Sequence, residues 1–219
     1  MLEPLSFAGL ALLLGFKHSY DADHIIAVAN VLRKTSTLAS AVRISISWAV
    51  GHMVTATVVT ILLYAFRESI LRTVLANFDK AVGIMLIVLG LFSLKDMFNS
   101  HSHTHKHGNI KHAHPHAHSN EGNIHKHAHK HMFGIGIIHG LASNDELLIL
   151  FAASLGLTTL PGILLGVAIF SAGVVLGMVL FALVFSYPLL KARSEFFYRL
   201  ITIVTGAASV AYGAAILLR

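Results

Sequence analysis

Long apolar runs alternate with short polar connections along most of the chain. A helix needs about 20 apolar residues to cross the roughly 30 Å of hydrocarbon in a bilayer. Six runs meet that length, and they cover residues 4–32, 44–66, 80–98, 132–157, 161–187 and 198–218. The pattern therefore predicts an all-α integral membrane protein with six transmembrane helices.

Composition and charge agree with this class. The chain is 55% hydrophobic and only 12% charged, whereas soluble domains carry about 25% charged residues. It contains no cysteine, which excludes disulfides and thiolate metal sites. The net charge of +6 would suit a nucleic-acid surface, but the basic residues fall between the apolar runs. They are better explained as topology signals, and no nucleic-acid partner is expected.

The basic residues also predict an orientation. Eleven of the 16 Lys and Arg residues follow the first, third and fifth spans, and loops rich in these residues stay cytoplasmic. We therefore expect a multi-pass protein of the plasma membrane with both termini outside. No removable signal peptide is evident, because the N-terminus lacks a basic region and runs directly into the first span.

A weak internal repeat relates the two halves of the chain. A shift of 121 residues aligns His18 with His139, Asp23 with Asn144, and His24 with Asp145; a shift of 123 aligns Gly83 with Gly206 and Gly90 with Gly213. Three spans in each half would make the two repeats inverted, with a substrate site near the midplane between them. The predicted division is a first repeat over residues 1–98, a histidine-rich cytoplasmic loop over 99–131, and a second repeat over 132–219. The alternative is chance similarity between apolar helices.

Two histidines and two aspartates interrupt the first apolar span: His18, Asp21, Asp23 and His24. Such groups are costly at membrane depth and usually have a function. On a regular helix, His18, Asp21 and His24 share one face and Asp23 points elsewhere. Either the helix is distorted here, or Asp23 holds the ring N–H of a ligating histidine. Imidazole with carboxylate suits nickel, cobalt, zinc or copper rather than magnesium or calcium, although a polar cluster that only joins helices is the alternative.

The pattern His18-x4-Asp23-His24 resembles the signature of the nickel/cobalt transporter (NiCoT) family, and the flanking Asp21 and Ile25 match the family's usual form. The resemblance implies a secondary transporter, not an enzyme, that has no cofactor and carries Ni²⁺ or Co²⁺ as its substrate. It also implies a metal-site role for these two histidines and two aspartates.

The resemblance extends to two further spans. The second span contains a Gly-His pair that matches the family, so His52 is expected in the metal path. The fourth span reads His139-Gly-Leu-Ala-Ser-Asn-Asp-Glu. It departs from the family's usual Phe-Asp-Thr-Ala-Thr-Glu except at the acidic end, and it is more similar to the UreH-like branch linked to urease maturation. The expected metal-site residues in this span are His139, Asn144, Asp145 and Glu146.

Twelve of the 16 histidines lie between His101 and His131. This segment has too few apolar residues to form a core, so we expect it to be disordered. Histidines at every second position could chelate transition metals in neighbouring pairs. The alternative is a solvated linker without a function.

The expected function is uptake of Ni²⁺ or Co²⁺ across the plasma membrane. No nucleotide-binding motif is present, and a dication entering down 100 mV gains about 4.6 kcal/mol. The expected partners are the divalent ion and the lipid bilayer, and cytoplasmic metallochaperones are compatible with the loop. The alternatives are Ni²⁺/Co²⁺ efflux, export of a small anion of the sulfite type, and a membrane metallochaperone that transports nothing.

Overall fold

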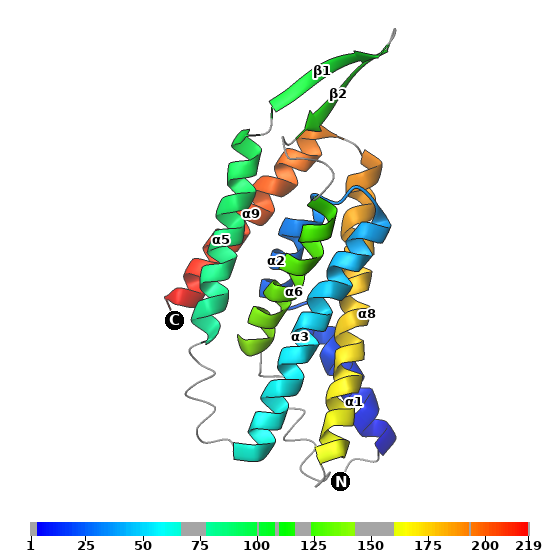
Figure 1. Cartoon of the computed structure of the whole chain (residues 1–219), viewed down its shortest axis with the longest axis vertical. Coiled ribbons are helices and arrows are strands. Elements are labelled where there is room, and N and C mark those ends of the chain that lie inside the picture. Colours follow the sequence, from blue (N-terminus) through cyan, green and yellow to red (C-terminus); the bar gives the residue numbers. More distant parts are fainter. Residues whose placement is uncertain are drawn as a thin grey trace.

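A computed structural model of the chain describes residues 4–66, 78–99, 101–107, 110–116, 124–142, 160–192 and 194–218. This part of the chain forms seven helices and one two-stranded hairpin (Figure 1). The elements are α1 (Pro4–His18), α2 (Ala22–Leu32), α3 (Leu38–Phe66), α5 (Phe78–Asn99), β1 (His101–His107), β2 (Ile110–His116), α6 (Ile124–Ala142), α8 (Leu160–Ala192) and α9 (Glu195–Leu217).

The helices have the length and the outer surface of membrane spans. Among the described residues, three segments are long and apolar enough to cross a membrane: Leu38–Leu62 of α3, α8 and α9. Every fourth residue of α3 from Ile46 to Val58 is exposed and apolar. Such a surface is unfavourable in water and favourable in lipid, where helices satisfy their own backbone groups. The prediction of a helical, multi-pass membrane protein is confirmed, although the structure does not establish six spans.

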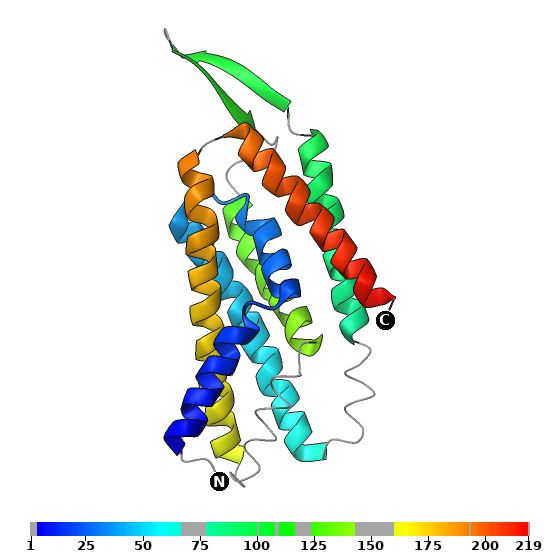
Figure 2. The same cartoon turned by 180° about the vertical axis from the view of Figure 1, so that it is seen from behind.

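The first predicted span is two helices rather than one. Helix α1 ends at His18, and α2 begins at Ala22 after a bend in the middle of the molecule (Figure 2). Tight turns form here, because the N–H groups of Tyr20 and Asp21 donate to the carbonyls three residues before them, each at 3.0 Å. Asp21 then adopts an extended conformation (φ −61°, ψ 146°) as the N-cap of α2. The first predicted span is therefore not one continuous helix, and the alternative of a distorted helix is confirmed.

The two pieces of this span pack against different neighbours. Helix α1 lies along α8, whereas α2 packs mainly against α9 and α5 and touches α8 and α3 less extensively. Polar bonds fix α2 to α9: Arg33 Nη1 donates to Tyr198 Oη at 2.9 Å, and Asn30 Nδ2 donates to the Thr205 carbonyl at 3.4 Å. The bend thus joins two separately anchored segments.

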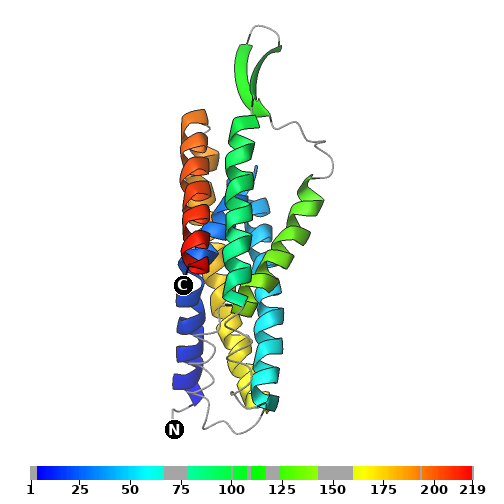
Figure 3. The ribbon, with the colours of Figure 1, turned by 90° about the vertical axis from the view of Figure 1, so that its left-hand side faces the viewer.

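Glycines bring the helix backbones close together. A Cβ on Gly15 of α1 would collide with the Phe170 backbone of α8, and one on Gly136 of α6 would collide with the Trp48 backbone of α3. Helices α5 and α9 lie side by side (Figure 3) and also approach each other closely at glycines. A Cβ on Gly90 would lie 2.6 Å from the Gly206 carbonyl oxygen. Small residues at helix contacts are typical of membrane proteins, because they allow close backbone approach.

Two strands and the start of a helix lie within the histidine-rich segment, and its disorder stays a prediction. Strands β1 and β2 pair as an antiparallel hairpin that projects from one end of the helices (Figure 1). Helix α6 begins at Ile124, eight residues before the predicted boundary at 132. The prediction considered only apolar burial, whereas hairpin and helix bonds are made by the backbone. The other boundaries of the three-part division stay predictions.

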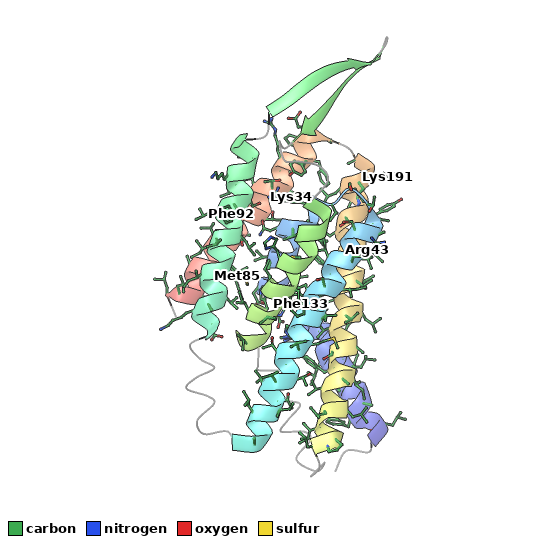
Figure 4. The ribbon with its side chains drawn as sticks, in the orientation of Figure 1. Lys34, Arg43, Met85, Phe92, Phe133 and Lys191 are labelled. Atoms are coloured by element: carbon green, nitrogen blue, oxygen red, sulfur yellow. The ribbon has the colours of Figure 1, made fainter. Side chains whose placement is uncertain are left out.

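Basic residues gather toward the hairpin end of the helices. Figure 4 shows Lys34, Arg43 and Lys191 in the half of the molecule nearest to the hairpin, with Phe92 on the outer side of α5. Phe92 is 61% exposed. The connections that carry most of the basic residues therefore share one end of the molecule.

Candidate metal site

Three histidines from three helices meet at the bend between α1 and α2. His18 is the last residue of α1, His24 lies in the first turn of α2, and His52 lies midway along α3. Each offers one ring nitrogen, and these nitrogens lie within 4.8 Å of one another. All three side chains are fully buried or nearly so. We refer to these three residues as the buried histidine cluster.

Two of these rings donate a hydrogen bond from Nδ1 to a neighbouring carboxylate. His18 Nδ1 donates to Asp21 Oδ2, and His24 Nδ1 donates to Asp23 Oδ1, each at 2.9 Å. A proton held on Nδ1 leaves the Nε2 lone pair of the same ring available to a metal, and the carboxylate raises its basicity. Asp23 thus contacts the His24 ring, as the second of the two sequence alternatives expected.

Asp21 departs from the arrangement expected on a regular helix, in which it shares a face with both histidines. The bend turns it toward the rear of the His18 ring, where it also lies 3.5 Å from Lys17 Nζ. Its side chain is 32% exposed, in contrast to the buried rings. The Asp21 carboxylate therefore marks the more open side of the site.

The nitrogens that face into the cluster are poorly satisfied by the protein. His18 Nε2 and His52 Nε2 lie 3.2 Å apart, so one ring donates its proton to the lone pair of the other. Because His18 carries its proton on Nδ1, the donor is His52 Nε2–H, and a cation could bind both Nε2 atoms once the His52 proton has moved to its Nδ1. His24 Nε2 is buried and has no hydrogen-bond partner among the residues that the structure describes. Unsatisfied buried polar atoms are uncommon and call for an explanation such as an ion.

A fourth histidine, His139 of α6, lies beside the cluster. It is fully buried, and its ring centroid is 5.1 Å from that of His24. Its Nδ1 lies 3.1 Å from the Ile135 carbonyl and 3.4 Å from Trp48 Nε1, and its buried Nε2 has no hydrogen-bond partner in the described part of the chain. Nδ1 can donate to the carbonyl or accept from the Trp48 N–H, and only the first arrangement leaves a lone pair on Nε2. The structure thus brings together the histidines of the first and fourth predicted spans.

Sequence reasoning gave no role to Trp48, which forms a wall of the site. Its ring centroid lies 4.9 Å from that of His24, 5.3 Å from His52 and 5.7 Å from His139. The available signal was its position four residues before His52, because residues i and i+4 share a helix face. On the opposite side, Phe170 of α8 lies 5.4 Å from His18. These aromatic rings exclude water and limit the ligands to those from the protein and a small ion.

The remaining predicted site residues, Asn144, Asp145 and Glu146, lie outside the described residues. Their placement near the metal stays a prediction.

The fold and the site define a helical membrane protein with imidazole donors buried at its centre. No family model matches the chain, and no solved structure matches it. Over 210 residues it is 28% identical to the urease accessory protein UreH of Bacillus sp. (strain TB-90), covering 95% of this chain and 89% of the relative. This likeness supports the resemblance to the UreH-like branch. The relative is named as an accessory protein rather than an enzyme, in agreement with the expectation for this chain.

Proposed function

We propose that the chain is a secondary transporter of Ni²⁺ or Co²⁺ and that the ion binds at the buried histidine cluster. The observation that carries this proposal is the convergence of three buried ring nitrogens within 4.8 Å, with two of the rings held by carboxylates. Neutral imidazole is a good ligand for nickel and cobalt and a poor one for calcium and magnesium. The name of the similar UreH protein also connects this chain with urease maturation.

The alternative is a cluster of polar residues that only joins helices, and the hydrogen bonding of the histidines argues against it. Polar residues that only join helices would satisfy one another. Here His24 Nε2 and His139 Nε2 are buried without a hydrogen-bond partner among the described residues. His24 Nε2 can present a lone pair, so an ion held by the three clustered histidines would satisfy it.

An anion exporter is also disfavoured by the local charges. The N-terminus of α2 points its positive dipole toward the site, and this could attract an anion. That position already carries two carboxylates, Asp21 as the N-cap and Asp23 in the first turn. Their negative charge favours a cation.

Two packing patterns support the proposed inverted repeat. In the proposed repeat, α6 corresponds to α1 and α3 corresponds to α8. The contact between α1 and α8 therefore corresponds to the contact between α6 and α3. The glycine contacts show the same correspondence between the two halves. Gly83 contacts Gly213, and the 123-residue shift turns this pair into Gly206 with Gly90, which is also in contact. A two-fold relation between inverted halves would produce these paired contacts and would put the site near the membrane midplane.

Within this proposal the transporter works in the direction of uptake. The basic residues near the hairpin end favour a cytoplasmic location for that end, with both termini outside. The membrane potential then draws a dication inward without a coupling ion. Efflux, which a histidine-rich cytoplasmic segment would also suit, is the second direction, and it requires exchange for another ion.

Purified protein in liposomes tests the function directly. With an inside-negative potential, wild-type vesicles should accumulate radioactive Ni²⁺. His18→Ala or His24→Ala should reduce the initial rate at least 100-fold, because each removes one of the three ring nitrogens that converge on the ion. His131→Ala is the matched control, since His131 is an exposed histidine of α6, and it should stay within twofold of wild type.

Wild-type rates in both cluster variants would contradict the proposed site. Sulfite transport by the same vesicles in the absence of Ni²⁺ transport would identify an anion exporter instead.

A further inference from the structure

The register of the hairpin pairs histidine with histidine at three alternate positions. His101 is opposite His116, His103 is opposite His114, and His105 is opposite His112. The intervening pairs are Ser102 with Pro115, Thr104 with Ala113, and Lys106 with Lys111. Because successive residues of a strand alternate between faces, the three histidine pairs and His107 belong to one face. We call these seven residues the histidine face.

We propose that the histidine face is a second metal site, which binds divalent transition-metal ions between the two members of a cross-strand pair. Directly opposed residues of an antiparallel pair have Cα atoms about 4.5–5.5 Å apart. Two imidazoles on neighbouring backbones at that spacing can reach one ion at about 2.0–2.1 Å. Successive pairs are about 6.6 Å apart along the strands, so up to about three ions fit side by side.

Metal binding and strand pairing should stabilise each other. A single two-stranded hairpin is at best marginally stable in water, and the Lys106–Lys111 pair sets like charges opposite each other. An ion held by both strands acts as a cross-link, and its binding free energy then contributes to folding. The affinity of this site should therefore depend on which histidines are opposed, and not only on how many are present.

This dependence on register gives a sharp test. In the starting variant, all twelve histidines between 101 and 131 are replaced, by Ser up to position 118 and by Gln in α6, where Gln is a better helix former. Two derivatives each retain one pair. The first retains His103 and His114, which are opposed, and the second retains His101 and His105, which are about 13 Å apart on one extended strand.

The two outcomes separate the hairpin from an unstructured segment. In a segment without pairing, the pair closer in sequence would bind at least as tightly, because it closes the shorter loop. In the hairpin, only the opposed pair can chelate. We expect full-length protein in detergent to bind Ni²⁺ at least tenfold more tightly with His103 and His114 than with His101 and His105. Isothermal titration, corrected with the starting variant, measures this difference, and equal or reversed affinities would overturn the proposal.

Hydrogen exchange supplies an independent measurement. Ni²⁺ should slow amide exchange across residues 101–116 of the wild type and leave the starting variant unchanged. Unchanged exchange in the wild type at saturating Ni²⁺ would overturn the coupling of metal to strand pairing. Both experiments measure binding rather than transport, so they can fail or succeed independently of the proposed function.

Discussion

The buried histidine cluster and the histidine face present the same donor group in opposite settings. In the cluster, helices on all sides hold each ring, and carboxylates fix the Nδ1 protons of His18 and His24. On the hairpin, only the pairing of two strands brings the histidines together. The first arrangement is organised before the ion arrives, whereas the second gains order from it. The cluster should therefore control selectivity and rate, and the hairpin should control how many ions the protein holds.

The largest expected effect comes from disturbing the helix packing around the buried histidine cluster. In Gly136→Val, the added side chain would collide with the Trp48 backbone and force α3 away from α6. Overpacking of this kind typically costs about 1–3 kcal/mol, and it would also displace His52. We expect loss of Ni²⁺ uptake and a lower unfolding temperature in detergent. Gly134→Ala is the control on the same helix, because no described atom outside the local helix backbone lies within 4 Å of the added Cβ; equal damage by both changes would contradict this account.

Removal of one supporting carboxylate should have the next largest effect. Asp23→Asn keeps the shape of the side chain but weakens the bond that fixes the His24 ring. Loss of such a partner typically reduces metal affinity about 10–100-fold. The Ni²⁺ concentration for half-maximal uptake should rise by that factor in vesicles. Asp21→Asn should have a smaller effect, since Asp21 is partly exposed; the reverse order would show that Asp21 is the more important partner.

A third test concerns the acidic end of the fourth predicted span. If Asp145 is the inverted counterpart of His24, it lies close to the ion, and Glu146 points about 100° away on a helix. Asp145→Asn should then reduce Ni²⁺ uptake about tenfold through weaker charge compensation. Glu146→Gln should change uptake less than twofold. If the two variants have equal rates, the repeat does not extend into the site.

The smallest effect on transport is expected from removal of the hairpin. Replacement of residues 101–116 by a flexible linker should leave the maximal Ni²⁺ uptake rate within about threefold of wild type. The number of ions bound per purified protein should fall, as equilibrium dialysis would show. Loss of uptake in a correctly folded deletion variant would make the hairpin an essential part of the ion path.

Sequence reasoning predicted the helical membrane fold and the close relation of His18, His24 and His139, because charged groups inside apolar runs need a shared partner. It left the state of the first span open between two alternatives, and both apply: the helix is broken, and Asp23 contacts a histidine ring. The position of the break was not predictable, because Ser19–Asp21 contains neither Pro nor Gly. The hairpin was missed because its pairing depends on backbone bonds between residues of low apolarity, which periodicity does not detect.

The bend between α1 and α2 has a mechanical consequence. His18 belongs to the segment anchored on α8, and His24 belongs to the segment anchored on α9. Any rotation of one anchored unit against the other must change the distance between these two ligands, whereas an unbroken helix would carry them together. In the proposed transporter, such a rotation would therefore separate two ligands of the ion, with the three residues of the bend as its pivot.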